Sequence, residues 1–308
     1  MSNNFKIHTP YDGSSQPFTI GLLQLDETQW LDEDENLSRY LDEKVSLYKA
    51  LPDQVLVKDE GTQQAQNEVL GLIHSHVLTH FPTIYRRDEN VMCVAGQHKV
   101  QLDDSRLGPL AIAALLVQED LVLMRKSDDG WKLVAASLCF PSAWNLLDKF
   151  RKPLHEIHAP VPDFGGGTRN ASLIERMFNN LSPARSVVRW NWSLYGDEKL
   201  YHPLSDNGLK RRFGGGEDIA GRVTLRLERQ TLRKLPQSGD ILFTIRIYLD
   251  PLEALERHAE GASLALSIEG QIMAMTDEQI AYKGPADEKA RLCARLREIA
   301  GQAKERVR

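Results

Sequence analysis

Three stretches in the second half of the chain alternate polar and apolar residues at period two, at residues 185–195, 222–232 and 240–249. Alternation of this kind places successive side chains on opposite faces of a strand, so it predicts three long antiparallel β-strands. We assign their polar positions to one shared face, which carries Arg189, Asn191, Ser193, Arg226, Glu228, Gln230, Thr244, Arg246 and Tyr248. This face is either solvated or a functional site, because charge buried at mid-strand is costly.

Apolar residues recur at helical spacing at both ends of the chain. Residues 36–51 and 62–80 predict two amphipathic helices in the N-terminal third. Residues 251–308 return to this spacing, with two apolar stripes formed by Leu264, Ile268 and Ile272 and by Leu292, Leu296 and Ile299. We therefore expect helices packed on both ends of a central sheet.

The middle of the chain contains shorter elements. Short apolar runs at 110–117, 121–125 and 131–140 predict strands, and residues 142–151 and 171–181 predict helices. The resulting order is strand, strand, helices and then three strands, which is that of a PAS domain among other folds. The sequence thus predicts an α+β fold, a PAS-like antiparallel five-stranded sheet with crossover helices.

We expect a single compact unit with three parts. Residues 1–107 form a mainly helical N-terminal extension packed on the core, residues 108–250 form the core, and residues 251–308 form a helical C-terminal extension. A chain of 308 residues is long enough to bury a proper core in this arrangement.

Composition and charge limit the partners. The net charge is −5, which argues against a nucleic-acid-binding surface. No apolar stretch approaches the roughly 18 residues of a membrane span, and the N-terminus lacks a signal-peptide core, so we expect a cytoplasmic protein with no membrane contact. Cys93, Cys139 and Cys293 are far apart and form no CxxC pair, which excludes a cysteine-ligated iron–sulfur or zinc site within the chain.

Histidine is the residue type best suited to bind a haem iron or another metal here. His76 and His80 are four residues apart on a predicted helix, but without a third ligand nearby they are best explained as structural. His155 and His158 follow the predicted helix 142–151 in a proline-rich segment that holds the backbone rigid. Either could point between helix and sheet as a ligand or could cap a backbone carbonyl, and spacing alone does not choose between them.

Two FGGG sequences, at 164–167 and 213–216, are the only candidates for a phosphate-binding loop. Neither is followed by Lys-Ser or Lys-Thr, and neither has GxGxxG spacing. We interpret both as flexible turns.

The polar sheet face offers a second half of a possible site. A buried Glu228 between Arg226 and Arg246 would stay ionised and would suit a cationic substrate such as an amine. The arginines could also bind haem propionates or polarise a ligand on the iron. The alternative is a salt-bridged face exposed to solvent. Trp190 and Trp192 point to the other face, which we expect to be core.

Five sequence segments resemble those of a known protein family. LVQEDLVLM, AASLCFPSAWNLLDKFRKPLHEIHAPVP, RWNWSLY, RLERQTLRKLP and FTIRIYLDPL, in this order, make residues 35–300 resemble the haem-dependent oxidative N-demethylase α-subunit family. The resemblance implies an iron-containing oxidoreductase, a monooxygenase-type subunit that binds haem b and uses O2 to demethylate a small secondary amine. In the characterised case dimethylamine yields methylamine and formaldehyde.

The resemblance also implies partner subunits and site residues. FMN, a 2Fe-2S cluster and tetrahydrofolate belong to other chains, which take electrons from NADPH in a flavin and iron–sulfur reductase. The IHAPVP motif places the axial iron ligand at His158, with His155 in reserve. Our own inference adds the distal groups: Glu228 binds the substrate ammonium, Arg226 or Arg246 anchors a propionate or polarises O2, and Tyr248, Asn191 and Arg189 complete the hydrogen bonding.

Two other functions compete with this one. The first is a non-catalytic haem-binding gas or redox sensor of the PAS type. The second is an assembly subunit that has kept the fold and lost the cofactor. A sensor usually carries an output domain, and this chain adds only helices.

Overall fold

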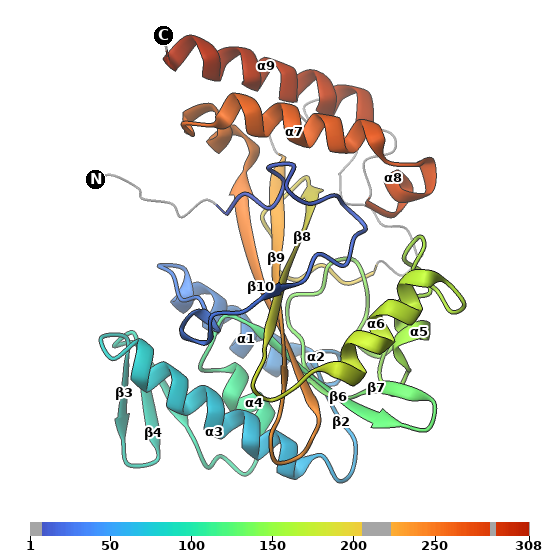
Figure 1. The fold of residues 1–308 in the computed structure, drawn as a ribbon. Helices are drawn as coiled ribbons and strands as arrows, with labels where there is room; N and C mark the ends of the chain where they lie inside the picture. The colour runs from blue at the N-terminus through green and yellow to red at the C-terminus, as the bar shows by residue number, and fades with distance from the viewer. Residues whose placement is uncertain (1–7, 205–222, 284–287, 308) are drawn as a thin grey trace.

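A computed structural model describes residues 8–204, 223–283 and 288–307 and shows an α+β fold built on a seven-stranded antiparallel sheet (Figure 1). Its spatial order is β1-β8-β9-β10-β6-β7-β2. The prediction of five strands is wrong, because β1 and β2, of two and three residues, add a short strand at each edge. The strands are β1 (Leu23–Gln24), β2 (Leu56–Lys58), β6 (Asp120–Ser127), β7 (Gly130–Ser137), β8 (Val187–Tyr195), β9 (Thr224–Lys234) and β10 (Ile241–Pro251). The three predicted long strands are confirmed as β8, β9 and β10, while Arg222 and the FGGG sequence at 213–216 lie outside the described residues.

The predicted terminal helices are confirmed. They are α1 (Leu37–Ala50) and α3 (Gln63–His80) near the N-terminus, and α7 (Gly261–Ala274) and α9 (Lys289–Val307) near the C-terminus. Short helical pieces join them: η1 (Glu27–Gln29), α2 (Pro52–Val55), η3 (Leu252–Arg257) and α8 (Asp277–Lys283). Figure 1 shows α7, α8 and α9 stacked over one end of β8, β9 and β10.

Two predictions in the middle of the chain are wrong. The apolar run 110–117 is not a strand but begins with helix α4 (Pro109–Ala114), which is buried on all sides, and a short buried run has no periodicity that distinguishes the two. Residues 142–151 form bends and turns instead of a helix, with positive φ angles at Ala143 and Arg151. The backbone carbonyls of Phe140 and Pro141, just before this segment, accept hydrogen bonds from the Arg226 side chain.

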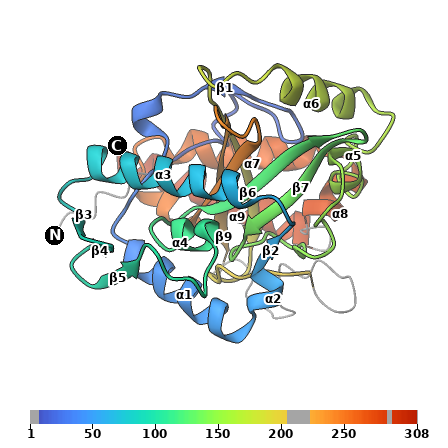
Figure 2. The ribbon, with the colours of Figure 1, turned by 90° about the horizontal axis from the view of Figure 1, so that it is seen from below.

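The N-terminal third also contains a small sheet that the pattern did not predict. Its strands are β3 (Tyr85–Asp88), β4 (Val91–Val94) and β5 (His98–Gln101), each of four residues. Strands this short carry too few alternations to be recognised. In Figures 1 and 2 they lie on the opposite side of the molecule from α5 (Leu154–Ile157) and α6 (Arg169–Asn180).

Both faces of the large sheet are covered. On one face, Leu121, Leu123 and Leu242 pack with α3 and α4, and the helices after β10 pack on Trp192 and Leu225 farther along the strands. On the other face, a second core contains side chains of α5 and α6 together with residues of β6, β7 and β10. Since neither face is left to solvent, the polar residues at mid-strand are either paired internally or line a cavity. Within the described residues, no helix is long and apolar enough to span a membrane.

Candidate functional site

A cavity of about 230 Å³ lies on the face of the sheet covered by α5 and α6. Most of its wall is apolar and comes from β6, β10, α6 and the N-terminal segment containing Phe18, Ile20 and Leu22. Its polar lining residues are Ser142, Lys149, His158, Arg189, Asn191, Ser193, Glu228, Gln230, Tyr282 and Lys283. Apolar walls with a few convergent polar groups are typical of a site for a small molecule or cofactor.

The pairing of β8 with β9 brings the predicted polar positions of these two strands together. Arg189 lies opposite Gln230, Asn191 opposite Glu228, and Ser193 opposite Arg226. Directly opposed residues of an antiparallel pair share a face, so this part of the predicted patch is confirmed.

Glu228 is the acidic group at the centre of this patch and is only 8% exposed. Its Oε2 accepts hydrogen bonds from Gln230 Nε2 at 2.7 Å and from Asn191 Nδ2 at 3.5 Å. Burial raises the pKa of this carboxyl, but a hydrogen bond from Ser142 and the charges of Arg226 and Lys283 outweigh it, so the net pKa is lowered. Glu228 is therefore an ionised carboxylate in the wall of the cavity.

His158 reaches the cavity from the C-terminal end of α5. Burial, helped by the charges of Lys149 and Arg189, lowers the pKa of its imidazole to about 4, while a hydrogen bond to the Leu154 backbone acts in the opposite direction. The ring is neutral at physiological pH, the state in which a histidine can bind a metal. His155, one turn away, is exposed and does not line the cavity.

Arg189 carries an unsatisfied donor in the same wall. Its Nη2 donates to the Thr19 carbonyl at 3.1 Å, but its buried Nε has no hydrogen-bond partner among the described residues. Burial lowers the pKa of the guanidinium and Glu228 raises it. A buried donor without a partner costs free energy, so this Nε is available to an acceptor oxygen of a molecule bound in the cavity.

Two lysines line the cavity that the sequence patterns did not single out. Lys149 Nζ lies 4.2 Å from the centre of the Trp144 ring, and Lys283 Nζ donates to Asn191 Oδ1 at 2.9 Å. Burial lowers the pKa of Lys149 to about 8, against the opposing effects of Glu228 and Asp148. No motif marks either lysine, because one lies in an irregular segment and the other at the end of a short helix.

The third strand of the predicted patch faces the other way. In the β9–β10 pair, Arg246 lies opposite Arg229 and Tyr248 opposite Leu227, whereas Glu228 lies opposite Ile247. Thr244, Arg246 and Tyr248 are thus on the face opposite the cavity, and the prediction of one shared face is wrong for these residues. Period two defines two alternative faces within a strand, but the register with the neighbouring strand decides which face is shared.

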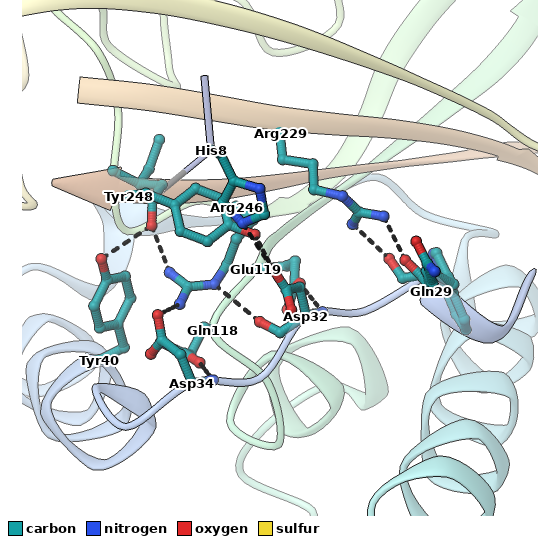
Figure 3. Close-up of polar contacts among 12 residues, drawn as sticks. His8, Gln29, Asp32, Asp34, Tyr40, Gln118, Glu119, Arg229, Arg246 and Tyr248 are labelled. Atoms are coloured by element: carbon teal, nitrogen blue, oxygen red, sulfur yellow. Dashed lines mark hydrogen bonds and ion pairs between the residues drawn. The ribbon is translucent and has the colours of Figure 1, made fainter. Parts of the chain in front are cut away.

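On that opposite face the polar groups form a network of their own (Figure 3). Arg246 donates to Asp34 Oδ2 at 2.8 Å and to the Asp32 carbonyl at 3.3 Å, and the Tyr248 hydroxyl donates to Asp32 Oδ2 at 2.7 Å. Arg229 binds the carbonyls of Gln29 and Trp30. We call Arg229, Arg246, Tyr248, Asp32 and Asp34 the opposite-face network. It holds residues 29–34 against the sheet.

Arg226 is on the cavity side of the sheet but does not line the cavity. Its side chain is fully buried and donates to Ser142 Oγ at 3.0 Å and to the carbonyls of Phe140, Pro141, Lys199 and Leu200. With these bonds made, it is poorly placed for the predicted contact with a propionate or O2. It supports the site indirectly, because Ser142 in turn bonds Glu228.

The glycine loop at 164–167 behaves as the turn that its sequence predicts. Gly167 has a φ of +83°, and Thr168 caps α6 by accepting a hydrogen bond from the Ala171 amide. Phe164 of this loop lines the cavity. Among the described residues, no group of three or more His, Cys, Asp or Glu side chains is arranged to hold a metal ion without a further cofactor.

Most of the chain matches a known protein family. Residues 21–293 match the model of the family described as haem-dependent oxidative N-demethylase, alpha subunit-like. The match spans most of the chain, including every described residue of the cavity wall that comes from the sheet. The chain belongs to this family.

Proposed function

We propose that this chain binds haem b in the cavity, with His158 as the axial ligand of the iron, and that it oxidatively demethylates a small secondary amine such as dimethylamine. One observation carries the proposal. A neutral imidazole, an ionised carboxylate and an arginine line a single cavity of mainly apolar walls, and the Nε of this arginine has no hydrogen-bond partner within residues 8–204, 223–283 and 288–307. The family name supports the haem and the reaction type.

The charges around the cavity fit haem. Lys149 and Arg189 each lie close enough to both His158 and Glu228 to shift a pKa through charge. Two cations near both groups would suit an anionic cofactor such as haem. They would complement the negative charge of the propionates, and Arg189 Nε would gain its missing acceptor.

Glu228 is the group best suited to the substrate. It is ionised, buried and fixed by Gln230 and Asn191, so it would bind an alkylammonium through a charge-assisted hydrogen bond. The apolar side chains around it, such as Phe243 and Ile245, would favour the methyl groups of a secondary amine over a hydrated cation.

In the reaction, bound haem iron would supply the centre at which O2 is reduced and the N-methyl group is oxidised. Glu228 would hold the amine nitrogen in one position, with Asn191 and Gln230 fixing the carboxylate. The apolar wall from Phe18 and Ile20 would limit access of water. Orientation of the substrate and exclusion of water are therefore the roles that this chain's own residues perform.

The remaining components belong to partners in this proposal. The term "alpha subunit" in the family name implies a complex of several subunits. We propose that other chains carry FMN, a 2Fe-2S cluster and tetrahydrofolate and deliver electrons from NADPH. The PAS-like character of the core is part of the same proposal, supported by the chain order β6, β7, α5, α6, β8, β9, β10.

A haem titration of the purified protein tests the proposal. We expect a Soret band that saturates at one haem per chain, that weakens strongly in His158→Ala, and that is unchanged in His155→Ala, the matched control one turn away. Loss of the band in His155→Ala alone would reassign the ligand, and no haem uptake by the wild type would refute the function.

A gas or redox sensor on the same scaffold predicts a different result. It would bind haem through His158 but would not form product. With dimethylamine, O2 and reductase subunits supplying electrons from NADPH, the demethylase releases formaldehyde in proportion to the amine consumed. Haem binding without formaldehyde under these conditions would favour the sensor.

A further inference from the structure

Lys149 lies in the cavity wall, and the proposed function uses it only as a positive charge. It belongs to the irregular segment between β7 and α5, and its backbone amide closes a turn on the Leu146 carbonyl at 3.0 Å. Its ammonium rests on the Trp144 ring, 4.2 Å from the centre. A ring contact of this kind does not occupy all three N–H donors of the ammonium.

The reaction consumes protons inside this cavity. For dimethylamine it is (CH3)2NH + O2 + 2 e− + 2 H+ → CH3NH2 + CH2O + H2O, with the two electrons supplied by the reductase subunits. One oxygen atom enters formaldehyde and the other leaves as water. Two protons must therefore reach the oxygen in each turnover, through a wall that is mostly apolar.

The other charged groups of the wall are poorly suited to supply them. Lys283 is fixed by hydrogen bonds from its Nζ to two acceptor oxygens of β8. Glu228 is ionised, and its pKa is lowered further by its partners. His158 is neutral, with a pKa of about 4. Arg189 keeps its proton at any physiological pH. Lys149, with a pKa of about 8, is mostly protonated at pH 7 and can release and regain a proton at low cost.

We propose that Lys149 is the proton donor of the cavity, delivering the protons that are consumed as O2 is reduced. The inference rests on the proposed function and names a residue that neither the motifs nor the family match identify. Trp144 positions the amine. Glu228 favours its reprotonation by attracting the ammonium form.

The test compares Lys149→Arg with Lys152→Arg. Arginine keeps the positive charge for haem binding but does not release a proton, and Lys152 is an exposed neighbour outside the cavity. We expect Lys149→Arg to bind haem within about twofold of the wild type but to form formaldehyde on the order of 100-fold more slowly at pH 7. The wild-type rate should fall above about pH 8 as Lys149 loses its proton, and Lys149→Arg should lose this alkaline limb.

A second measurement uses the apo-protein and does not depend on turnover. Labelling with acetic anhydride across a pH series, followed by mass spectrometry, should give a reactivity midpoint for Lys149 near pH 8, well below the value of about 10.4 for a lysine in an unstructured peptide.

The outcomes are distinguishable. A Lys149→Arg protein with the wild-type rate and pH profile would overturn the proton-donor role while leaving the proposed function intact. A labelling midpoint near 10.5 would overturn it as well. Failure of the wild type to bind haem or to form formaldehyde would instead refute the proposed function, and the proton-donor role with it.

Discussion

The two faces of the central sheet carry similar residue types in different states. On the cavity face, Arg189 has a buried Nε that no group in the described part of the chain contacts through a hydrogen bond. On the opposite face, Arg246 is fully buried and donates to Asp34 and to the carbonyls of Asp32 and Ile247. Both arginines alternate with apolar residues in the sequence, so polarity alone does not distinguish a site from a structural network.

The two faces differ in whether their buried polar groups have hydrogen-bond partners within the protein. The opposite-face network satisfies its donors with backbone carbonyls and carboxylates, which fixes residues 29–34 on the sheet. The cavity face holds Glu228 and Arg189 with acceptor or donor capacity directed into a cavity. Substitutions on the two faces should therefore separate loss of stability from loss of ligand binding.

The largest effect is expected at Arg246. Arg246→Met leaves Asp34 and several backbone carbonyls without their buried partner, so the free energy of unfolding should fall by about 3–5 kcal/mol. Arg189→Met should cost about 1 kcal/mol or less, because loss of its hydrogen bond to Thr19 and of its attraction to Glu228 is offset by removal of a buried charge. Urea denaturation of the apo-proteins measures both. Equal losses at the two positions would contradict the distinction between the faces.

The next effect is the pH dependence contributed by His158. Its pKa is about 4 in the folded apo-protein and near 6.5 when unfolded, so between these values the unfolded state binds more protons. Stability should therefore fall as the pH drops from 6.5 to 4, by no more than about 3 kcal/mol from this group.

Urea denaturation at pH 7 and pH 4.5 measures this contribution as the difference between the wild type and His158→Asn. The variant should lose less stability than the wild type on acidification. An identical loss in both proteins would show that the imidazole is not buried as described.

A smaller effect is expected on haem affinity at Arg189. If its Nε binds a propionate, Arg189→Met should weaken haem binding about tenfold, the equivalent of one charge-assisted hydrogen bond of about 1.4 kcal/mol. Tyr248→Phe, on the opposite face, is the matched control and should bind haem as the wild type does. Soret titration gives both constants. An unchanged haem affinity in Arg189→Met would show that Arg189 does not bind haem.

The sequence predicted the elements better than their register. Alternation located β8, β9 and β10, and helical spacing located α1, α3, α7 and α9, because each pattern runs long enough to be distinctive. It did not predict that β10 presents Phe243 and Ile245 to the cavity and Arg246 to the other side, since register depends on the β9–β10 turn.

The candidate site was predictable only where a pattern or motif marked it. Glu228, Asn191 and Arg189 follow from the pairing of two alternating strands, and His158 follows from the IHAPVP motif. Lys149 and Ser142 come from an irregular segment that was predicted to be a helix. Arg226 was predicted to contact a propionate or O2, because the backbone carbonyls that it binds are distant in sequence and no pattern reveals them. Contacts of this kind follow from the tertiary fold alone.

The most direct test of the cavity as the functional site is the Soret response of the haem-loaded protein to dimethylamine. We predict a saturable shift in the wild type and in Tyr248→Phe, and at least tenfold weaker amine binding in Glu228→Gln, where the carboxylate charge is removed. Equal amine binding in the wild type and Glu228→Gln would contradict the central claim, as would a loss confined to Tyr248→Phe.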